Sequence, residues 1–375
     1  MLIQNGSVFF EDAYHQVDVR CRDGKIVEIG ENLTGEEQKV DATGLLVFPG
    51  FLDTHIHGFN TATCVNGVQD VKLVAKGLPA FGVTGYIPTF SEPDAETTVV
   101  AVRYVREAGS CPGARMLGMH IDMPYRNRGG HYAAIKTPPT KAHTLSMVDG
   151  DLSDIRILCA APELPGAMEW FSWVAEQGVV AEIGNTMCTA TQIRQAADHG
   201  ATLLNHFYNG YAQMDHHENG AIVGALLEDR LYAQLNCDGI HVAEEFIKLT
   251  IRVKGTHLVA PVTDCSHFQG MEEGEYTYGK KEIARKVFYK DGAVRDEAGK
   301  LVTGAHPFDE NMRTLKSFGY TLEEIGTLCA ETPAKSVQIT DRGKIAVGRL
   351  ADFAILSPDL YVQKTIMDGK IVYEK

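Results

Sequence analysis

Short apolar runs alternate with helix-like stretches through the middle of this chain, and a polar residue recurs where each apolar run ends. Residues 84–89 form one such run, residues 96–107 the helical stretch after it, and residues 116–120 the next run. Repeated strand and helix implies parallel strands joined by crossovers. The polar residues at the ends of the runs are His55, His57, Asp122, Glu163, Asn185, His206, Asp238, His241 and Asp264. Because the carboxyl ends of the strands form the catalytic face of a TIM barrel, we predict an α/β fold, a TIM (β/α)8 barrel with these side chains at its mouth.

Both ends of the chain have a different pattern, in which short apolar runs are joined by tight turns. These runs are residues 8–10, 17–20, 26–30, 351–356 and 366–373. A TIM barrel takes about 250 residues, so a chain of 375 residues has room for a second module. We therefore predict that residues 1–48 and 343–375 pair into one small β-sandwich domain, and that residues 49–342 form the barrel.

Composition and charge exclude several classes of protein. Hydrophobic residues make up 44% of the chain and charged residues 22%, which is ordinary for a soluble globular protein with a large core. The net charge of -14 disfavours binding to the phosphate backbone of nucleic acids. No apolar run approaches the roughly 18 residues of a membrane-spanning helix. The chain starts without a signal-peptide pattern, and its eight cysteines are scattered singly. We predict a cytoplasmic protein with reduced thiols and with no nucleic-acid or membrane partner.

His55 and His57 follow an apolar run at residues 49–53 and stand two positions apart. On a strand, both side chains project to the same face and can bind one ion through imidazole nitrogens. A bare pair of this kind is weak evidence, because two strand histidines can equally be held by hydrogen bonds. The carboxylates and histidines at the later strand ends favour a metal site.

Asp264 ends a late apolar strand. Its carboxylate could accept a proton from metal-bound water and pass it to a leaving nitrogen. It could instead be the N-cap of the following segment. Position alone leaves both interpretations open, and the metal context favours catalysis.

Nine short motifs follow one another along the chain: residues 49–58, 82–89, 118–124, 129–131, 161–163, 205–210, 237–241, 262–264 and 336–356. In this order they resemble the motifs of the amidohydrolase superfamily and, within it, of the N-acetylglucosamine-6-phosphate deacetylases. The resemblance covers nearly the whole chain, and the ordered set is much more specific than any single motif.

The resemblance implies a zinc-type hydrolase in which hydroxide attacks an acetamide carbonyl and releases acetate and an amino sugar. A metal lowers the pKa of bound water from about 15.7 towards 7, which supplies this nucleophile. By position, Asp264 matches the acid/base and His206 a metal ligand. The positions that match substrate contacts are His131, Asn209, Gly210 and His241. The resemblance also implies a homodimer.

Two metal positions depart from the family pattern. Asp122 stands where the family has Glu, so its carboxylate is shorter by one methylene, about 1 Å. Asn185 stands where the family has His, and an amide oxygen is a poor zinc ligand. We therefore predict one divalent ion, zinc, rather than two. Its ligands would be mainly His55, His57 and Asp122, with Asp264 as a further candidate ligand, and His206 would be available to a second ion or to the substrate.

The phosphate-binding motif also differs. Residues 216–220 read His-His-Glu-Asn-Gly, whereas the family has an Arg in a His-Arg-Glu-Pro-Gly-like stretch. Loss of a permanently charged, bidentate donor weakens recognition of a sugar 6-phosphate. Protonated His217 is a partial substitute. Arg126 and Arg128 are further candidates, although exposed loop arginines are more often solvated.

Three functions are compatible with these differences from the family pattern. The first is deacetylation of an N-acetylated amino sugar, a small-molecule substrate. The second is hydrolysis of another N-acyl compound or of a cyclic amide. The third is a catalytically inactive sugar-binding paralogue that has lost the metal. Retention of His55, His57 and Asp264 argues against the third.

Overall fold

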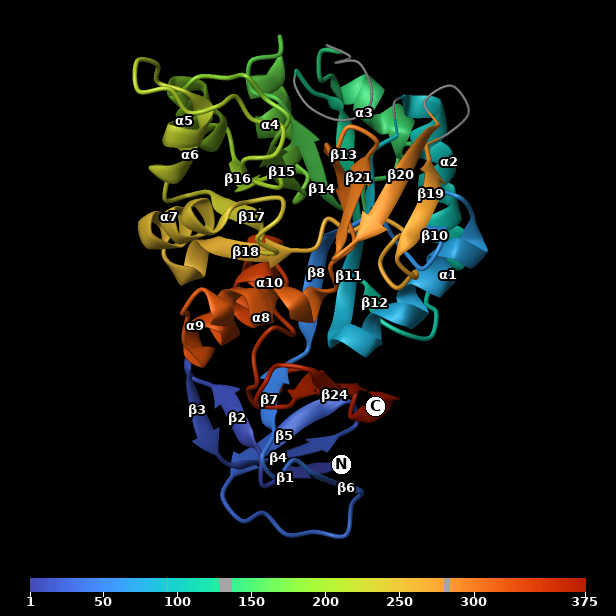
Figure 1. The fold of residues 1–375 in the computed structure, drawn as a ribbon, viewed down its shortest axis with the longest axis vertical. Coiled ribbons are helices and arrows are strands. Elements are labelled where there is room, and N and C mark those ends of the chain that lie inside the picture. The colour runs from blue at the N-terminus through green and yellow to red at the C-terminus, as the bar shows by residue number, and fades with distance from the viewer. Residues whose placement is uncertain (93, 128–136, 280–283) are drawn as a thin grey trace.

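The structure, a computed structural model, describes residues 1–92, 94–127, 137–279 and 284–375. Eight parallel strands form a barrel at its centre (Figure 1). In order around the barrel they are β8 (Phe51–Ile56), β11 (Val83–Phe90), β13 (Met119–Tyr125), β14 (Ile155–Ala160), β15 (Val180–Ile183), β16 (Ala201–Leu204), β17 (Tyr232–Asn236) and β18 (Val259–Val262). A parallel bridge between Ile56 and Cys265 links the end of β18 back to β8. The predicted TIM barrel is confirmed.

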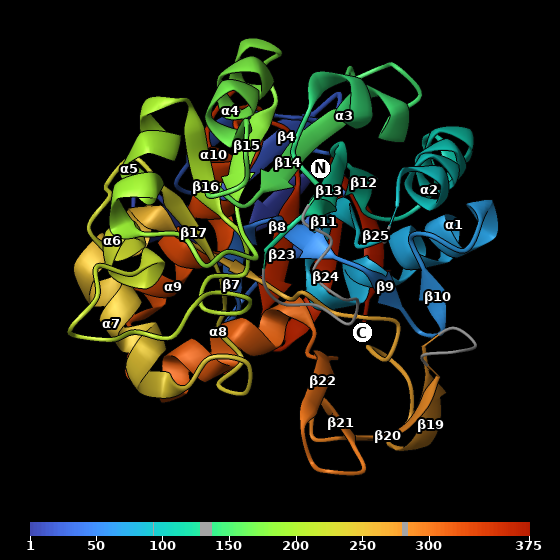
Figure 2. The same cartoon turned by 90° about the horizontal axis from the view of Figure 1, so that it is seen from above.

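Helices follow the strands and surround the barrel, as Figure 2 shows from above. They are α1 (Val68–Gly77), α2 (Ala95–Ala108), α3 (Lys141–Met147), α4 (Ala167–Glu176), α5 (Ala190–Asp198), α6 (Ala221–Leu226), α7 (Glu244–Lys254), α8 (Phe308–Ser317), α9 (Leu322–Gly326), the π-helix Thr327–Glu331 and α10 (Thr332–Ser336). Every residue of β8 and β11 is buried, as expected for strands covered on both faces. At the start of α5, Thr189 and Gln192 form a capping box, which fixes the loop after β15.

Short elements complete the barrel: β9 (Gly58–Phe59), β10 (Ala62–Thr63), β12 (Arg115–Met116) and the 3-10 turns Leu78–Phe81 and Thr256–Leu258. The helices in the described ranges include none long and apolar enough to cross a membrane. All eight cysteines are free thiols and all but Cys111 are buried, as the sequence predicts.

The two ends of the chain pair with each other below the barrel in Figure 1. One sheet has the order β5-β4-β1-β6 and the other the order β25-β24-β23-β7-β2-β3. The strands are β1 (Leu2–Gln4), β2 (Ser7–Phe10), β3 (Ala13–Gln16), β4 (Asp18–Arg22), β5 (Lys25–Gly30), β6 (Lys39–Asp41), β7 (Leu46–Pro49), β23 (Phe353–Leu356), β24 (Val362–Met367) and β25 (Lys370–Glu374). Ile3, Val19, Val47 and Phe353 belong to one core shared by both sheets. The predicted β-sandwich is confirmed, while its division from the barrel at residues 49 and 343 stays a prediction.

A third sheet is inserted between β18 and α8, and the sequence analysis did not predict it. It is antiparallel, in the order β19 (Gly274–Tyr278), β20 (Arg285–Lys290), β21 (Ala293–Asp296) and β22 (Leu301–Gly304). Phe268, Val287, Val294 and Ala305 form its own small core. We call β19–β22 the inserted sheet. Figure 2 shows it at the rim of the barrel, outside the ring of helices.

Candidate active site

Three predicted residues converge at the carboxyl ends of β8 and β18. The Asp264 Oδ1 atom lies 3.0 Å from His57 Nε2 and 3.3 Å from His55 Nε2, and the two Nε2 atoms are 3.3 Å apart. Two imidazole nitrogens and a carboxylate oxygen are a donor set that zinc accepts. The structure therefore brings His55, His57 and Asp264 together as the sequence predicts.

The outer nitrogen of each imidazole is held by a hydrogen bond. His57 Nδ1 lies 3.1 Å from the Thr89 carbonyl oxygen, which can only accept, so Nδ1 carries the proton. His55 Nδ1 lies 3.0 Å from Gln234 Oε1 and donates to it in the same way. Both Nε2 lone pairs then face the Asp264 carboxylate. Lone pairs that face one another are stabilised by a cation between them, so these residues fit a divalent ion.

Burial and charge act differently on the three groups: burial lowers the pKa of His57, but the hydrogen bond and charge of Asp264 raise it more, so the net shift at His57 is upward. Burial lowers the pKa of His55 to about 4, so the imidazole is neutral at pH 7. Burial raises the pKa of Asp264, but His55 and His57 lower it more, and the net pKa lies well below its usual range. Asp264 is therefore an anion beside two histidines, as a ligand or proton acceptor must be.

Asp122 lies next to this group, but both of its carboxylate oxygens accept hydrogen bonds from other side chains. Its Oδ2 accepts a hydrogen bond of 2.8 Å from Ser91 Oγ. Its Oδ1 accepts one of 3.4 Å from Asn185 Nδ2 and another from Asn205 Nδ2. Among the described residues, the three-donor group at the barrel mouth contains His55, His57 and Asp264 but not Asp122. Ligation by Asp122 or Asn185 stays a prediction.

His206 lies beside His55, and its role as a metal ligand stays a prediction. Its ring centroid lies 5.5 Å from that of His55. Its Nδ1 is buried and has no hydrogen-bond partner within the described ranges. A buried polar atom without a partner is uncommon and points to an unseen ligand or water.

Three of these residues share an unusual backbone. Asn185, His206 and Asp264 have φ values of 51°, 23° and 49°, and each stands two positions after the last residue of its strand. Left-handed backbone is uncommon outside glycine, and such strain gathers at functional sites. It is least expected at His206, because Asn and Asp tolerate it better.

A second buried pair lies deeper in the barrel. His120 Nε2 is 2.8 Å from Glu182 Oε2, and both side chains are fully buried. Burial lowers the pKa of His120 to about 3 and raises that of Glu182 to about 8. Burial thus favours the uncharged forms of both side chains. His120 is therefore a buried residue held by a hydrogen bond.

The predicted substrate contacts divide into two groups. Asn209 Nδ2 donates to Asn236 Oδ1 at 3.1 Å, and a Cβ on Gly210 would lie 2.5 Å from Asn185 Oδ1. Both therefore lie in the barrel mouth. His217 is exposed on the surface beside His216 and Asp215. His131 and Arg128 lie outside the described residues.

His241 is tightly held by Asp238. Its Nδ1 lies 2.6 Å from Asp238 Oδ2, and its backbone N–H donates to Asp238 Oδ1 at 2.9 Å. Burial lowers the pKa of His241, but Asp238 and Asp264 raise it more, so the net shift is upward. His241 is therefore a candidate cationic contact near Asp264.

Several residues around the site were missed by the sequence analysis: Ser91, Glu182, Asn205 and Gln234. Each is a polar side chain within or just after an otherwise apolar strand, and that interruption is the signal that could have found them. Arg126, considered as a solvated loop residue, is instead 1% exposed. It follows β13 by one residue, and the next N–H, that of Asn127, donates to the Asn185 carbonyl at 2.8 Å.

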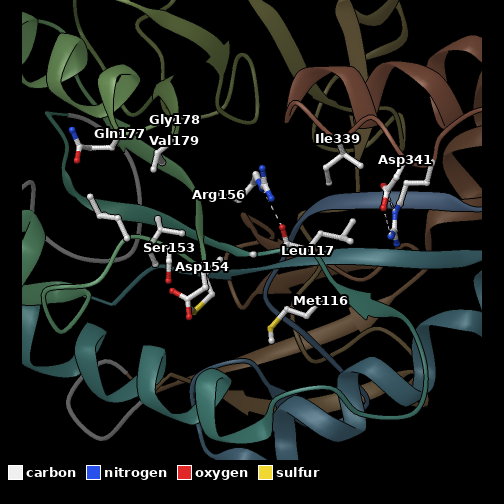
Figure 3. Close-up of a pocket in the computed structure, with 15 residues that line it drawn as sticks. Met116, Leu117, Ser153, Asp154, Arg156, Gln177, Gly178, Val179, Ile339 and Asp341 are labelled. Atoms are coloured by element: carbon white, nitrogen blue, oxygen red, sulfur yellow. Dashed lines mark hydrogen bonds and ion pairs between the residues drawn. The ribbon is translucent and has the colours of Figure 1, made fainter. Parts of the chain in front are cut away.

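A cavity of about 570 Å³ lies at the opposite end of the barrel (Figure 3). It is lined by residues at the amino-terminal ends of strands, among them Gly118, Ile155 and Val179. Arg156 Nε donates to the Leu117 carbonyl there at 3.1 Å, and no histidine is among the lining residues. This end of a TIM barrel supports stability, whereas catalysis occurs at the carboxyl ends. The candidate active site is therefore the mouth that contains His55 and Asp264.

Known proteins of one kind are similar to the whole chain, although no protein-family model matches it. The N-acetylglucosamine-6-phosphate deacetylase of Lysinibacillus sphaericus is 26% identical over 369 residues, which cover 95% of this chain and 93% of that protein. The mouse enzyme of the same name is 29% identical over 400 residues, covering 100% and 94%. The crystal structure of the Thermotoga maritima enzyme matches with a TM-score of 0.86 at 26% identity and covers all of both chains. The resemblance found in the sequence is thus confirmed: this chain is similar over its full length to N-acetylglucosamine-6-phosphate deacetylases and has the barrel fold of the amidohydrolase superfamily.

Proposed function

We propose that this protein is a metal-dependent hydrolase of linear amides that removes the acetyl group from an N-acetylated amino sugar. The observation that carries the proposal is the convergence of His55, His57 and Asp264 at the barrel mouth. The names of the relatives make N-acetylglucosamine 6-phosphate the first substrate to test.

One divalent ion, zinc by its donor set, would be held by His55 Nε2 and His57 Nε2 with Asp264 Oδ1 beside them. When bound, such an ion supplies a water of lowered pKa and polarises the acyl carbonyl. Gln234 and the Thr89 carbonyl keep the protons on the outer nitrogens, so the inner lone pairs stay directed at the ion. Hydrogen bonds from β8 to β11 and β17 thus fix the orientation of both imidazole rings.

Asp264 would move the proton of the reaction. Its carboxylate accepts a proton from the attacking water and donates it to the amide nitrogen, so that acetate and a free amine leave. Because its pKa is lowered, Asp264 is deprotonated at pH 7 and its carboxylate has room for the proton. Asn209 and His241 would bind and orient the sugar, because both lie at the same mouth.

Acetate release is the direct test of this function. We expect acetate from N-acetylglucosamine 6-phosphate, and about one divalent ion per chain in protein purified without chelator. An N-acyl amino acid, a cyclic amide and an ammonia assay cover the other amidohydrolase chemistries. If acetate appears only from the N-acyl amino acid, or a ring opens instead, the sugar substrate is wrong. A metal content below about a tenth of an equivalent would favour the inactive sugar-binding paralogue.

The number of ions can be tested separately with Asn185→His. We expect this variant to bind more metal per chain, because it puts an imidazole next to the Asp122 carboxylate in place of the Asn185 amide that donates to it. Elemental analysis after dialysis gives the stoichiometry. Asn32→His, at an exposed position of the β-sandwich, is the matched control. An unchanged metal count in the first variant would mean that Asn185 does not stand at a vacant metal position.

Two further expectations belong to this proposal. The protein would be a homodimer, which sedimentation of the purified chain would measure. It would act in the cytoplasm, where reduced cysteines persist. Its partner would be the small-molecule substrate alone.

A further inference from the structure

The inserted sheet is attached to the candidate active site through its last residue. Gly304, at the end of β22, forms a parallel bridge with Cys265, and its carbonyl accepts a hydrogen bond of 3.2 Å from the Ser266 N–H. Both partners directly follow Asp264 in the chain. The edge of the inserted sheet is therefore fixed against the segment that carries the proposed acid/base.

Gly304 also lies against His241. A Cβ at Gly304 would stand 2.6 Å from His241 Cε1, which is closer than real side chains approach. Only glycine fits there without displacing the imidazole. This Cβ would point from one face of the inserted sheet towards His241. That face therefore lies beside the barrel mouth.

The strand register places one arginine on that face. Ala293 of β21 is directly opposite Gly304, and residues opposed in an antiparallel pair point to the same side. The register of β21 with β22 shifts between Val294 and Arg295, but β21 pairs regularly with β20 from Ala293 to Asp296. Arg295, two positions further along β21, therefore shares the face of Ala293. Val294, between them, points the other way into the small core of the sheet. Arg295 therefore projects from the side that contacts His241.

The guanidinium of Arg295 is exposed and has few protein partners. In the described part of the chain, its side chain donates one hydrogen bond, 3.2 Å from Nη1 to the Gly299 carbonyl in the turn between β21 and β22, and forms no ion pair with a carboxylate. Burial and the charge of Arg295 both lower the pKa of His241, against the larger effect of Asp238 and Asp264. An exposed hydrogen bond to one carbonyl leaves the other guanidinium donors able to bind an anion.

We propose that Arg295, together with His241, binds an anionic group of the substrate, a phosphate monoester on the amino sugar. This inference rests on the proposed deacetylase function. Residues 216–220 contain no arginine, and Arg295 of the inserted sheet would supply the permanent cation in its place. A guanidinium binds phosphate through two parallel hydrogen bonds, and in a chain of net charge -14 a local cation is needed to attract such a substrate.

The test compares phosphorylated and unphosphorylated substrates. For Arg295→Ala we expect KM for N-acetylglucosamine 6-phosphate to rise about tenfold or more. KM for N-acetylglucosamine and kcat for both should change less than about twofold, because the contact is made away from the reacting amide. Arg295→Lys should keep part of the preference, since it keeps the charge but not the fork of donors. Lys300→Ala, in the turn between β21 and β22, removes a charge from the same sheet and should behave as wild type.

Calorimetry separates this inference from the proposed function. Wild-type protein should bind glucosamine 6-phosphate more tightly than glucosamine, and Arg295→Ala should lose that difference while Lys300→Ala keeps it. This holds even if no acetate is released, a result that would overturn the deacetylase alone. The role of Arg295 is wrong if its loss raises KM equally for both substrates, if Lys300→Ala has the same effect, or if wild-type protein binds both sugars equally.

Discussion

Replacing Asp264 by Asn should lower kcat by about 10²-fold or more, because an amide cannot accept the proton that the carboxylate takes. The substitution keeps the shape of the side chain, so the barrel should stay folded. The measurement is kcat for acetate release, with circular dichroism and metal content recorded on the same sample. Since Asp264 Oδ1 lies 3.0 Å from His57 Nε2, the metal content also shows how far Asp264 contributes as a ligand.

A matched control exists for this variant. Asp291 is an aspartate in the same left-handed backbone, with φ 50° against 49° at Asp264, but it lies in the exposed turn between β20 and β21. Asp291→Asn should therefore keep wild-type turnover. If Asp264→Asn also turned over at a near-normal rate, Asp264 would have no part in proton transfer.

Loss of His55 should remove the bound ion and reduce acetate release to background. His55 is completely buried, and its Nε2 is one of the three converging donors, so alanine leaves no replacement ligand. Gln234→Leu should have a smaller effect, lowering metal affinity by about 10- to 100-fold, because it removes only the hydrogen bond that orients His55. Competition with a chromogenic chelator measures both affinities without an activity assay.

The order of these effects is the critical outcome. His199→Ala, a histidine paired with Ser172 at the end of α5, is the control and should bind metal normally. Equal metal affinity in wild-type and His55→Ala protein would exclude His55 as a ligand. A Gln234→Leu variant as weak as His55→Ala would mean that Gln234 does more than orient the ring.

The barrel and the centre of its site were predictable because both depend on short-range sequence patterns. Two histidines two positions apart on a strand must share a face, and parallel strands bring their carboxyl ends together. Those two rules are enough to place His55, His57 and Asp264 in one mouth, without knowledge of any distance. The pairing of the chain ends followed from similar runs of apolar residues and turns.

The partners of those residues were not predictable, because they depend on the stagger of strands far apart in sequence. His55 and Gln234 are 179 residues apart, and His120 and Glu182 are 62 apart. A single polar residue in an apolar strand indicates a buried hydrogen bond but does not name its partner. The inserted sheet was missed because its strands lie where the repeating pattern of strand and helix leads one to expect barrel elements.

The pairing of β7 with β23 has a consequence for synthesis of the chain. β7 ends at Pro49 and β23 starts at Phe353, so β7 leaves the ribosome some three hundred residues before its neighbour. At about 5–20 residues per second that interval is tens of seconds. During it one edge of the β3-β2-β7 ladder stays open, and open edges are sites of aggregation. The β-sandwich can close only as the last strands emerge, so truncation or stalling near the C-terminus would expose the earliest-made part of the protein.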